Sequence, residues 1–205
     1  MDLEMTGLDA TENVIVEIAT LITDDELNII AEGPDLVIHA TEDDLAKMDP
    51  VVVAMHASSG LTEEIKASRI TLEEAGEATL AFLKEHIAEA GTVPLCGNSI
   101  GMDRRFLTAY LPDIENFLHY RSIDVSTIKE LAKRWYRGEV SSYSKKPSAH
   151  RAMDDIKESV SELRYWREQV FRDTSAIPEG EGIEGAPGAT DQGVAGQGVA
   201  GQGVA

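Results

Sequence analysis

The 205-residue sequence is poor in several features, and each shortage excludes a class of protein. It has one cysteine, Cys96, so it cannot form an internal disulfide, which favours a reducing cytoplasm over a disulfide-stabilised secreted fold. No apolar run approaches the roughly 18 residues that cross a bilayer, since Glu17 interrupts the run from 14 to 22. The segment 1–4 also lacks the basic and then apolar order of a secretion signal. We therefore expect a cytoplasmic protein that does not associate with membranes.

Basic residues are also scarce, with 18 Lys and Arg against 37 Asp and Glu, which gives a formal charge of -19. At face value this charge argues against a partner as acidic as nucleic acid. The charge is uneven, however: residues 1–103 hold 4 basic and 22 acidic residues, whereas residues 104–151 hold 10 and 5. This locally basic segment is either a solvated helix face or a place where a phosphate binds, and composition alone does not decide between them.

The last 33 residues differ in composition from the rest of the chain. Residues 173–205 contain 9 of the 17 glycines, no aromatic residue and three copies of the repeat Gln-Gly-Val-Ala. Such a segment cannot offset the entropy of ordering a glycine-rich chain. We therefore expect a single folded domain over residues 1–172, followed by a disordered tail over 173–205.

Strand and helix patterns alternate within residues 1–172. Two β-branched runs flank the turn-like Asp24-Asp25-Glu26 and predict a hairpin, and Thr71 with Glu74 forms a capping box at the start of a helix. Ser126 is the expected cap of a later helix, and the last helix is expected to bury Ile156, Val160, Leu163 and Val170. The predicted strands cover 13–23, 27–39, 93–96 and 120–125, and the predicted helices cover 71–90, 101–110, 126–135 and 150–171. This order indicates an α/β layer fold with a central sheet.

Three acidic residues suggest a cation site at the ends of predicted strands. Asp2 and Glu4 are two residues apart in an extended segment, so both side chains project from one face. Burying such a pair is costly unless a cation neutralises it, and oxygen ligands suit Mg²⁺ or Mn²⁺. Asp103 lies in the first turn of a helix that follows a strand, where α/β sheets bind ligands. Taken singly, an acidic N-terminus and an aspartate favoured by the helix dipole also explain these residues.

His150 and Asp155 lie at the start of the last predicted helix. Five residues correspond to about 500° of helix, so the two side chains converge only if His150 lies in the loop or first turn. The spacing leaves open whether Asp154 or Asp155 faces inward. Together with the other carboxylates, these residues favour a phosphodiesterase with two metal ions, in which a histidine accepts the proton of the attacking water.

Longer motifs resemble the oligoribonuclease family, the DEDDh-type 3′→5′ exoribonucleases of the DnaQ-like, RNase H-like superfamily. The resemblance runs from residue 1 to about 171. Its motifs are Asp-Leu-Glu-Met-Thr-Gly-Leu at 2–8, His-Ala-Ser-Ser-Gly-Leu at 56–61, Cys-Gly-Asn-Ser-Ile-Gly at 96–101 with Asp-Arg-Arg-Phe-Leu at 103–107, His-Tyr-Arg at 119–121 with Asp-Val-Ser at 124–126, Lys-Glu-Leu-Ala at 129–132, and His-Arg-Ala at 150–152 with Asp-Asp-Ile at 154–156.

The resemblance implies an RNase H-like (DnaQ-like exonuclease) fold with a central mixed β-sheet flanked by helices. It implies hydrolysis of very short oligoribonucleotides, especially dinucleotides, to 5′-mononucleotides, and a homodimer. His150 becomes the general base, and the family spacing selects Asp155 over Asp154. The catalytic set that binds two divalent cations, Mg²⁺ or Mn²⁺, is then Asp2, Glu4, Asp103 and Asp155.

The resemblance also implies a set of substrate contacts. Leu8 is expected to wedge between the two bases, and Tyr120 is expected to reach the site of the other subunit. The 5′-phosphate is expected to be capped by Ser99, Arg121, Ser126 and Thr127, and further contacts are expected from Met5, Thr6 and His56. A cap that holds a terminal phosphate rejects longer chains, and the forked donors of Arg121 suit a phosphate.

The sequence departs from the family in two places. Many relatives have several apolar residues before the Asp-x-Glu pair, whereas only Met1 precedes it here, so we expect a clipped first strand and lower stability than in a longer version. Val51 stands where some relatives have a tryptophan that packs on a base. Two alternatives therefore remain: a DNA-directed exonuclease of the same superfamily, and a dinucleotide-binding module with impaired catalysis.

Overall fold

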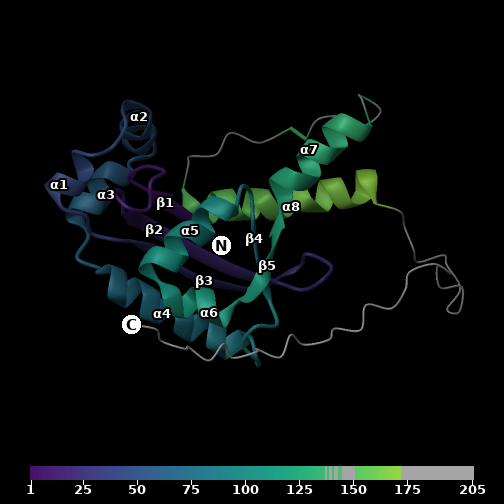
Figure 1. The fold of residues 1–205 in the computed structure, drawn as a ribbon, viewed down its shortest axis with the longest axis horizontal. Helices are drawn as coiled ribbons and strands as arrows, with labels where there is room; N and C mark the ends of the chain where they lie inside the picture. Colours follow the sequence, from purple (N-terminus) through teal and green to yellow (C-terminus); the bar gives the residue numbers. More distant parts are fainter. Residues whose placement is uncertain (137, 139, 141–142, 145–150, 172–205) are drawn as a thin grey trace, which may run out of the picture. The chain divides into compact units, whose positions relative to one another are not determined.

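The computed structural model describes residues 1–136, 138, 140, 143–144 and 151–171 (Figure 1). Within it, Met1–Phe171 form one compact unit. The tail expected over residues 173–205 and the expected general base, His150, lie outside the described residues. Those two expectations therefore stay predictions.

Five strands form two hydrogen-bonded ladders. The first is an antiparallel sheet in the order β1-β2-β3, and the second is a parallel pair of β4 and β5. Between them, the Met1 amino group donates to the Cys96 carbonyl over 3.2 Å. The strands are β1 (Asp2–Met5), β2 (Ile15–Thr23), β3 (Ile29–Val37), β4 (Pro94–Gly97) and β5 (His119–Asp124). The predicted hairpin is confirmed, whereas the single central sheet is divided into two ladders among the described residues.

Eight helices accompany these strands in the described part of the chain. They are α1 (Glu42–Leu45), α2 (Pro50–Ser59), α3 (Leu61–Ala67), α4 (Leu72–His86), α5 (Gly101–Tyr110), α6 (Pro112–Phe117), α7 (Val125–Trp135) and α8 (Ala152–Val170). The predicted capping box of α4 is present, because the Thr71 hydroxyl accepts from the Glu74 N–H and the Glu74 carboxylate accepts from the Thr71 N–H. None of the described helices has the length and apolar character that a membrane crossing requires.

Two helix predictions need correction. The N-cap of α7 is Asp124, whose carboxylate accepts from the Ser126 N–H at 2.9 Å, so Ser126 is a residue of the first turn. The buried face of α8 is centred on Ile156, Ser159, Glu162 and Trp166, and three of the four residues predicted there, Val160, Leu163 and Val170, are only partly buried. The buried stripe is rotated from the predicted one because Ser159 and Glu162 are buried although they are polar. The helices α1, α2, α3 and α6 were not predicted.

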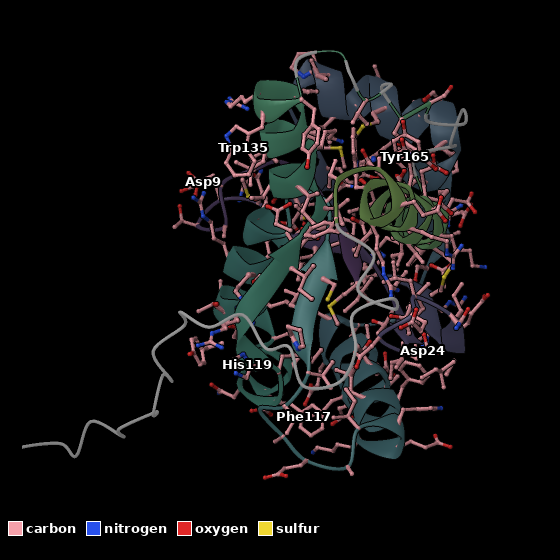
Figure 2. All side chains as sticks on the ribbon, turned by 90° about the vertical axis from the view of Figure 1, so that its right-hand side faces the viewer. Asp9, Asp24, Phe117, His119, Trp135 and Tyr165 are labelled. Carbon is pink, nitrogen blue, oxygen red and sulfur yellow. The ribbon has the colours of Figure 1, made fainter. Side chains whose placement is uncertain are left out.

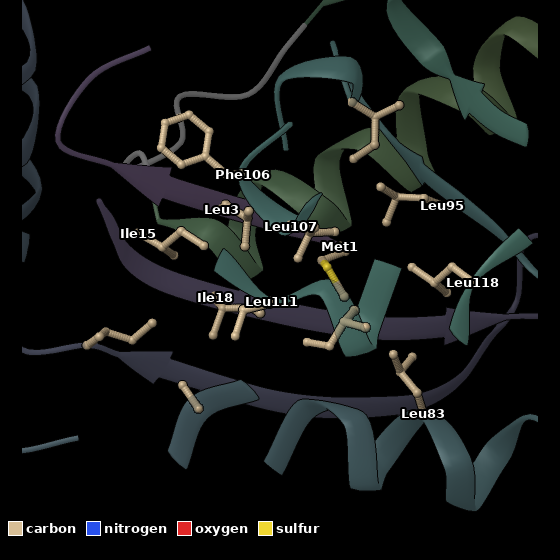
Figure 3. Close-up of a cluster of buried hydrophobic side chains, with 14 of the residues drawn as sticks. Met1, Leu3, Ile15, Ile18, Leu83, Leu95, Phe106, Leu107, Leu111 and Leu118 are labelled. Carbon is tan, nitrogen blue, oxygen red and sulfur yellow. The ribbon is translucent and has the colours of Figure 1, made fainter. Parts of the chain in front are cut away.

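The residues of β2 alternate between two layers of the fold. Ile18 belongs to the larger core cluster, with Leu83 of α4 and Phe106 of α5 (Figure 3). The next residue, Ala19, instead packs with Ile156 of α8. Helix α8 therefore covers one face of the antiparallel sheet, and α4 and α5 cover the other.

The same alternation orients β1. Leu3 is opposite Ile18, and Figure 3 shows it in the core cluster. Asp2 is opposite Ala19, and Glu4 is opposite Glu17, so both carboxylates project from the face that α8 covers. The predicted spacing of two residues thus places both side chains opposite the first turn of α8.

Candidate active site

Three of the four predicted carboxylates come together between β1 and α8. Asp2, Glu4 and Asp155 each offer a carboxylate oxygen, and these atoms lie within 4.8 Å of one another. Asp154, the alternative to Asp155, is exposed. The first turn of α8 therefore presents Asp155 to the two carboxylates of the strand.

Asp103 lies beside this cluster and is joined to it through the backbone. It is in the first turn of α5, as predicted, and it is buried. Its Oδ1 accepts a hydrogen bond from the Leu3 N–H at 2.9 Å, midway between Asp2 and Glu4. Asp103 thus fixes the strand that carries the other two carboxylates, and its negative charge raises the pKa of Asp2.

The pKa values show how unfavourable this concentration of negative charge is. Burial, followed by the charges of Asp103 and Glu4, raises the pKa of Asp2 to about 8. Burial, followed by the charges of Glu17 and Asp155, raises the pKa of Glu4 to about 8. Burial raises the pKa of Asp103 to about 6, although the hydrogen bond from Leu3 opposes it. A cation would relieve this strain, and a set of carboxylate oxygens fits a hard divalent ion.

His56 lies next to Glu4 and contacts the end of β1. Its side chain is fully buried, its Nε2 is 3.0 Å from the Met5 carbonyl, and its Nδ1 is 3.9 Å from Glu4 Oε2. Thr6 is also buried, and its hydroxyl accepts from the Val14 N–H at 3.0 Å. Among the predicted substrate contacts, His56 and Thr6 therefore contact protein atoms, and Met5 is half-buried.

Leu8 projects from a closed loop between β1 and β2. Its side chain is 68% exposed. A Cβ added at Gly7 would lie 2.4 Å from Asn13 Oδ1, the atom that accepts a hydrogen bond from the Asp9 N–H. A side chain at residue 7 would therefore displace the Asn13 amide that ties the loop next to Leu8.

A cavity of about 350 Å³ contains both the carboxylates and part of the predicted phosphate cap. Its lining includes Ser99 and Ser126 together with Asp2, Glu4 and Asp155. Ser99 has a left-handed backbone, with φ at 52°, and its N–H donates to Asp124 Oδ1 at 3.0 Å and to Ser126 Oγ at 3.1 Å. The turn after β4 and the first turn of α7 thus hold the two serines together.

The other predicted cap residues lie on the surface outside the lining of this cavity. Arg121 and Thr127 are exposed, and Tyr120 is 74% exposed. The Arg121 guanidinium lies 5.2 Å from the centre of the Tyr120 ring, which also stacks on His119. Figure 2 shows His119 at the start of β5. The exposed edge of β5 therefore presents an aromatic and a cationic side chain side by side.

An ion-pair network that the sequence analysis missed anchors the start of α8. Glu17 is fully buried, and its carboxylate accepts from Arg151 Nε at 2.9 Å and from the Ala152 N–H at 3.1 Å. Arg151 also donates to both carboxylate oxygens of Glu64, at 2.7 and 2.9 Å. The network joins β2, α3 and α8 and so fixes the turn that carries Asp155. Its signal was Glu17, the one charge inside a strongly apolar strand.

Comparison with known proteins identifies the family of the chain. Residues 1–163 match a protein family described as Exonuclease. The chain is 54% identical to the oligoribonuclease of Shewanella loihica over 172 residues, which cover 84% of this chain and 94% of that protein. It is 51% identical to the oligoribonuclease of Rhodococcus jostii over 171 residues, which cover 83% and 86% of the two chains. For the oligoribonuclease of Photobacterium profundum the identity is 53% over 171 residues, with 83% and 93% covered. The chain therefore belongs to the oligoribonuclease family of exonucleases.

Proposed function

We propose that the protein is a 3′→5′ exoribonuclease that hydrolyses very short oligoribonucleotides, dinucleotides above all, to 5′-mononucleotides. The observation that carries the proposal is that the Asp2, Glu4 and Asp155 carboxylates line the same cavity as Ser99 and Ser126. A cluster suited to cations and a set of hydroxyl groups suited to a phosphate thus share one small space. The oligoribonucleases that are 51–54% identical to the chain support the same activity.

The four carboxylates fit a site for two divalent cations, Mg²⁺ or Mn²⁺. Asp2, Glu4 and Asp155 offer the clustered oxygens, and Asp103 adds a fourth carboxylate next to β1. When bound, the cations supply electrostatic stabilisation of the charge on the phosphate oxygens and lower the pKa of water. The raised pKa values of Asp2 and Glu4 support a cation as the missing partner of these side chains.

His150 is the proposed general base. Its ordinary pKa near 6.5 suits it to accept the proton of the attacking water at neutral pH. Arg151, the next residue in the sequence, is held by Glu17 and Glu64 at the start of α8.

Substrate length is set by the cap in this proposal. Ser99, Arg121, Ser126 and Thr127 hold the 5′-phosphate, and a further nucleotide would collide with them. Leu8 enters between the two bases, which its exposure permits. Tyr120 reaches the site of a partner subunit in a homodimer, and its 74% exposure leaves the ring available for that contact.

We place the enzyme in the cytoplasm. Cys96 is the only cysteine, so no internal disulfide favours an oxidising compartment. Short RNA fragments are also products of RNA turnover, a cytoplasmic process.

The decisive experiment follows mononucleotide release from a 5′-phosphorylated diribonucleotide by the purified full chain with Mg²⁺ or Mn²⁺. A long single-stranded DNA serves as the competing substrate. We expect fast release from the dinucleotide and slow release from the DNA. Faster hydrolysis of the DNA would favour the DNA-directed alternative. Binding of the dinucleotide without turnover at pH 8, by protein whose folding is confirmed, would favour the binding module.

A further inference from the structure

Glu162 is a buried carboxylate with donors from three parts of the fold. It lies on α8 and is 5% exposed. Its oxygens accept from Asn98 Nδ2 at 3.1 Å and from Trp166 Nε1 at 3.2 Å, and Lys129 Nζ lies 3.0 Å away. Figure 2 shows α8, which carries Tyr165, and α7, which carries Trp135, and the two helices share a buried cluster around Trp166. A buried carboxylate that accepts from three donors is held in one position by them.

Asn98 links Glu162 to the serines of the cavity through hydrogen bonds. Its Oδ1 accepts the Ser126 hydroxyl at 2.9 Å, and its Nδ2 donates to Ser159 Oγ at 3.0 Å as well as to Glu162. Ser159 Oγ in turn donates to the Asp155 carbonyl at 2.8 Å. A continuous chain of hydrogen bonds therefore runs from the backbone of Asp155 to the hydroxyl of Ser126.

Helix α8 carries Asp155, Ser159 and Glu162, and so fixes the spacing of these residues along the chain of hydrogen bonds. Asp155 and Glu162 are seven residues apart, which is two turns, so they share a face at a separation of about 10 Å along the axis. Both line the cavity, together with Lys129 and Ser126 of α7. One helix thus carries a carboxylate of the cation cluster and the carboxylate that Asn98 and Lys129 contact.

Lys129 is the only cationic side chain that lines this cavity among the described residues. Its side chain is 31% exposed, whereas that of Glu162 is 7% exposed. The ammonium group has three donors, so it can keep Glu162 as a partner and still donate to a phosphate. Glu162 therefore holds a positive charge inside a cavity that is otherwise rich in carboxylates.

We propose that Glu162 is a positioning residue for recognition of the substrate's 5′-phosphate. It holds the Lys129 ammonium where the phosphate binds, and it orients the Asn98 amide, which fixes the position of Ser126 beside that group. The inference rests on the proposed function, since it assigns the phosphate end of that same site. It adds three residues, Glu162, Asn98 and Lys129, to the determinants of selectivity for a 5′-phosphorylated end.

The direction in which phosphate binding changes when Glu162 is substituted distinguishes a positioning role from a purely electrostatic one. If Glu162 acted only as a negative charge, Glu162→Gln would improve binding of a phosphate dianion, because it removes a repulsion. If Glu162 positions Lys129 and Asn98, the same substitution weakens binding of the phosphate. Glutamine has nearly the same shape as glutamate, but it is neutral, so it loses the ion pair with the Lys129 ammonium and brings an NH₂ group into a site that is already rich in donors.

The test compares two dinucleotides that differ only at the 5′ end, one with a phosphate and one with a hydroxyl. We expect Glu162→Gln to lower kcat/KM for the phosphorylated dinucleotide by about tenfold, the scale of one charge-assisted hydrogen bond, mainly through KM. The 5′-hydroxyl dinucleotide should change by less than about twofold, because it lacks the group that the cap contacts. Equal losses with both substrates, or a gain with the phosphorylated one, would overturn the proposal.

Glu158→Gln is the matched control. Glu158 lies one turn before Glu162 and lines the same cavity, but its carboxylate hydrogen-bonds to Tyr143. The control removes the same charge from the same helix, so it should change kcat/KM in the same direction for both dinucleotides. Lys129→Gln, at a partly exposed side chain, should reproduce the selective loss even if Glu162→Gln folds poorly. A Lys129→Gln enzyme that keeps full preference for the 5′-phosphate would contradict the proposal.

Direct binding keeps this inference separate from the proposed function. If the wild-type chain binds the dinucleotides but hydrolyses neither, the proposed activity fails, while calorimetry with the same two dinucleotides still tests Glu162. A tenfold loss of affinity confined to the phosphorylated dinucleotide supports the inference in that case too. Unchanged affinity in Glu162→Gln would refute it.

Discussion

Glu4 and Glu17 are opposite each other in β1 and β2, and both side chains are buried on the face that α8 covers. The Glu17 carboxylate accepts hydrogen bonds from Arg151 and from the Ala152 N–H. Glu4 faces the carboxylates of Asp2 and Asp155, and burial, followed by the charges of Glu17 and Asp155, raises its pKa to about 8. Paired positions of one ladder thus hold a donor-satisfied carboxylate, which Arg151 neutralises, and a charge-crowded carboxylate, which we propose is neutralised by a cation. The two differ in their neighbours, although both are buried.

Asp103→Asn should have the largest effect, because it removes a carboxylate from the charge-crowded group while keeping an oxygen that accepts the Leu3 N–H. We expect turnover of the dinucleotide to fall by about 10³-fold or more, the scale of lost electrostatic stabilisation in a metal site. The assay is mononucleotide release with Mn²⁺, and circular dichroism is the check on folding. Substantial residual turnover in a folded variant would discredit Asp103 as part of the site.

His150→Ala should be next in size. The loss of a general base costs about 10²–10⁴-fold in kcat. Because the proposed role of the imidazole is to accept a proton and not to bind the cation, the concentration of Mn²⁺ that gives half-maximal activity should stay the same. A large change in that concentration would move His150 from proton transfer to cation binding.

Arg151→Met tests the ion pair of Glu17, the donor-satisfied carboxylate of the two. It leaves Glu17 buried without its cationic partner, so unfolding by urea should show a loss of about 3–5 kcal/mol, the usual cost of breaking a buried pair. Adding Glu17→Gln in the same chain should recover most of that loss, because the unpaired charge is removed.

The matched control for Arg151 is Lys157→Met. Lys157 pairs with Glu32 at 2.8 Å, but both side chains are well exposed. An exposed pair contributes about 0–1 kcal/mol, so the control should unfold close to the wild-type midpoint. Equal losses for Lys157→Met and Arg151→Met would show that burial of the pair does not matter.

The stability of the metal-free protein should also depend on pH. Asp2 and Glu4 have folded pKa values of about 8, above their ordinary values of 3.8 and 4.5, so the folded state binds more protons in between. The stability of the metal-free protein should therefore fall as pH rises from about 4 to 8. Melting temperatures in a chelator, measured across this range, test the direction.

A divalent cation should reverse this trend. The cation competes with protons for Asp2 and Glu4, so its stabilising effect should be larger at pH 8 than at pH 6. Asp2→Asn should reduce the difference, because one of the two titrating carboxylates is removed. A cation effect that is independent of pH would indicate binding elsewhere.

Local sequence signals predicted much of the fold. The capping box of Thr71 and Glu74 and the turn after β2 depend on neighbouring residues, and both were found. The short helices between β3 and α4 were missed, because an element such as α1 has only Glu42–Leu45 in which to show a period.

Long-range partners were the part of the site that the sequence could not supply. The i, i+2 pattern placed Asp2 and Glu4 on one face, but nothing local pairs Glu17 with Arg151, 134 residues away. Glu162 is a second example. Its place in the sequence is typical of a surface residue on an amphipathic helix, and only the structure shows that Asn98 and Lys129 contact its carboxylate. The division of the strands into two ladders likewise depends on how β1 and β4 meet in space.

The loop of Gly7 and Leu8 has a consequence for the thermodynamics of binding. The loop is tied at its base by the pairing of Thr6 with Val14 and across its middle by Asn13 and Asp9. A leucine held in solvent by such a frame loses little conformational freedom when bases close around it. The unfavourable hydration of that side chain is carried by the folded protein before any RNA arrives. In the proposed contact with the bases, association would release this hydration free energy, so that even a ligand of two nucleotides would gain apolar burial.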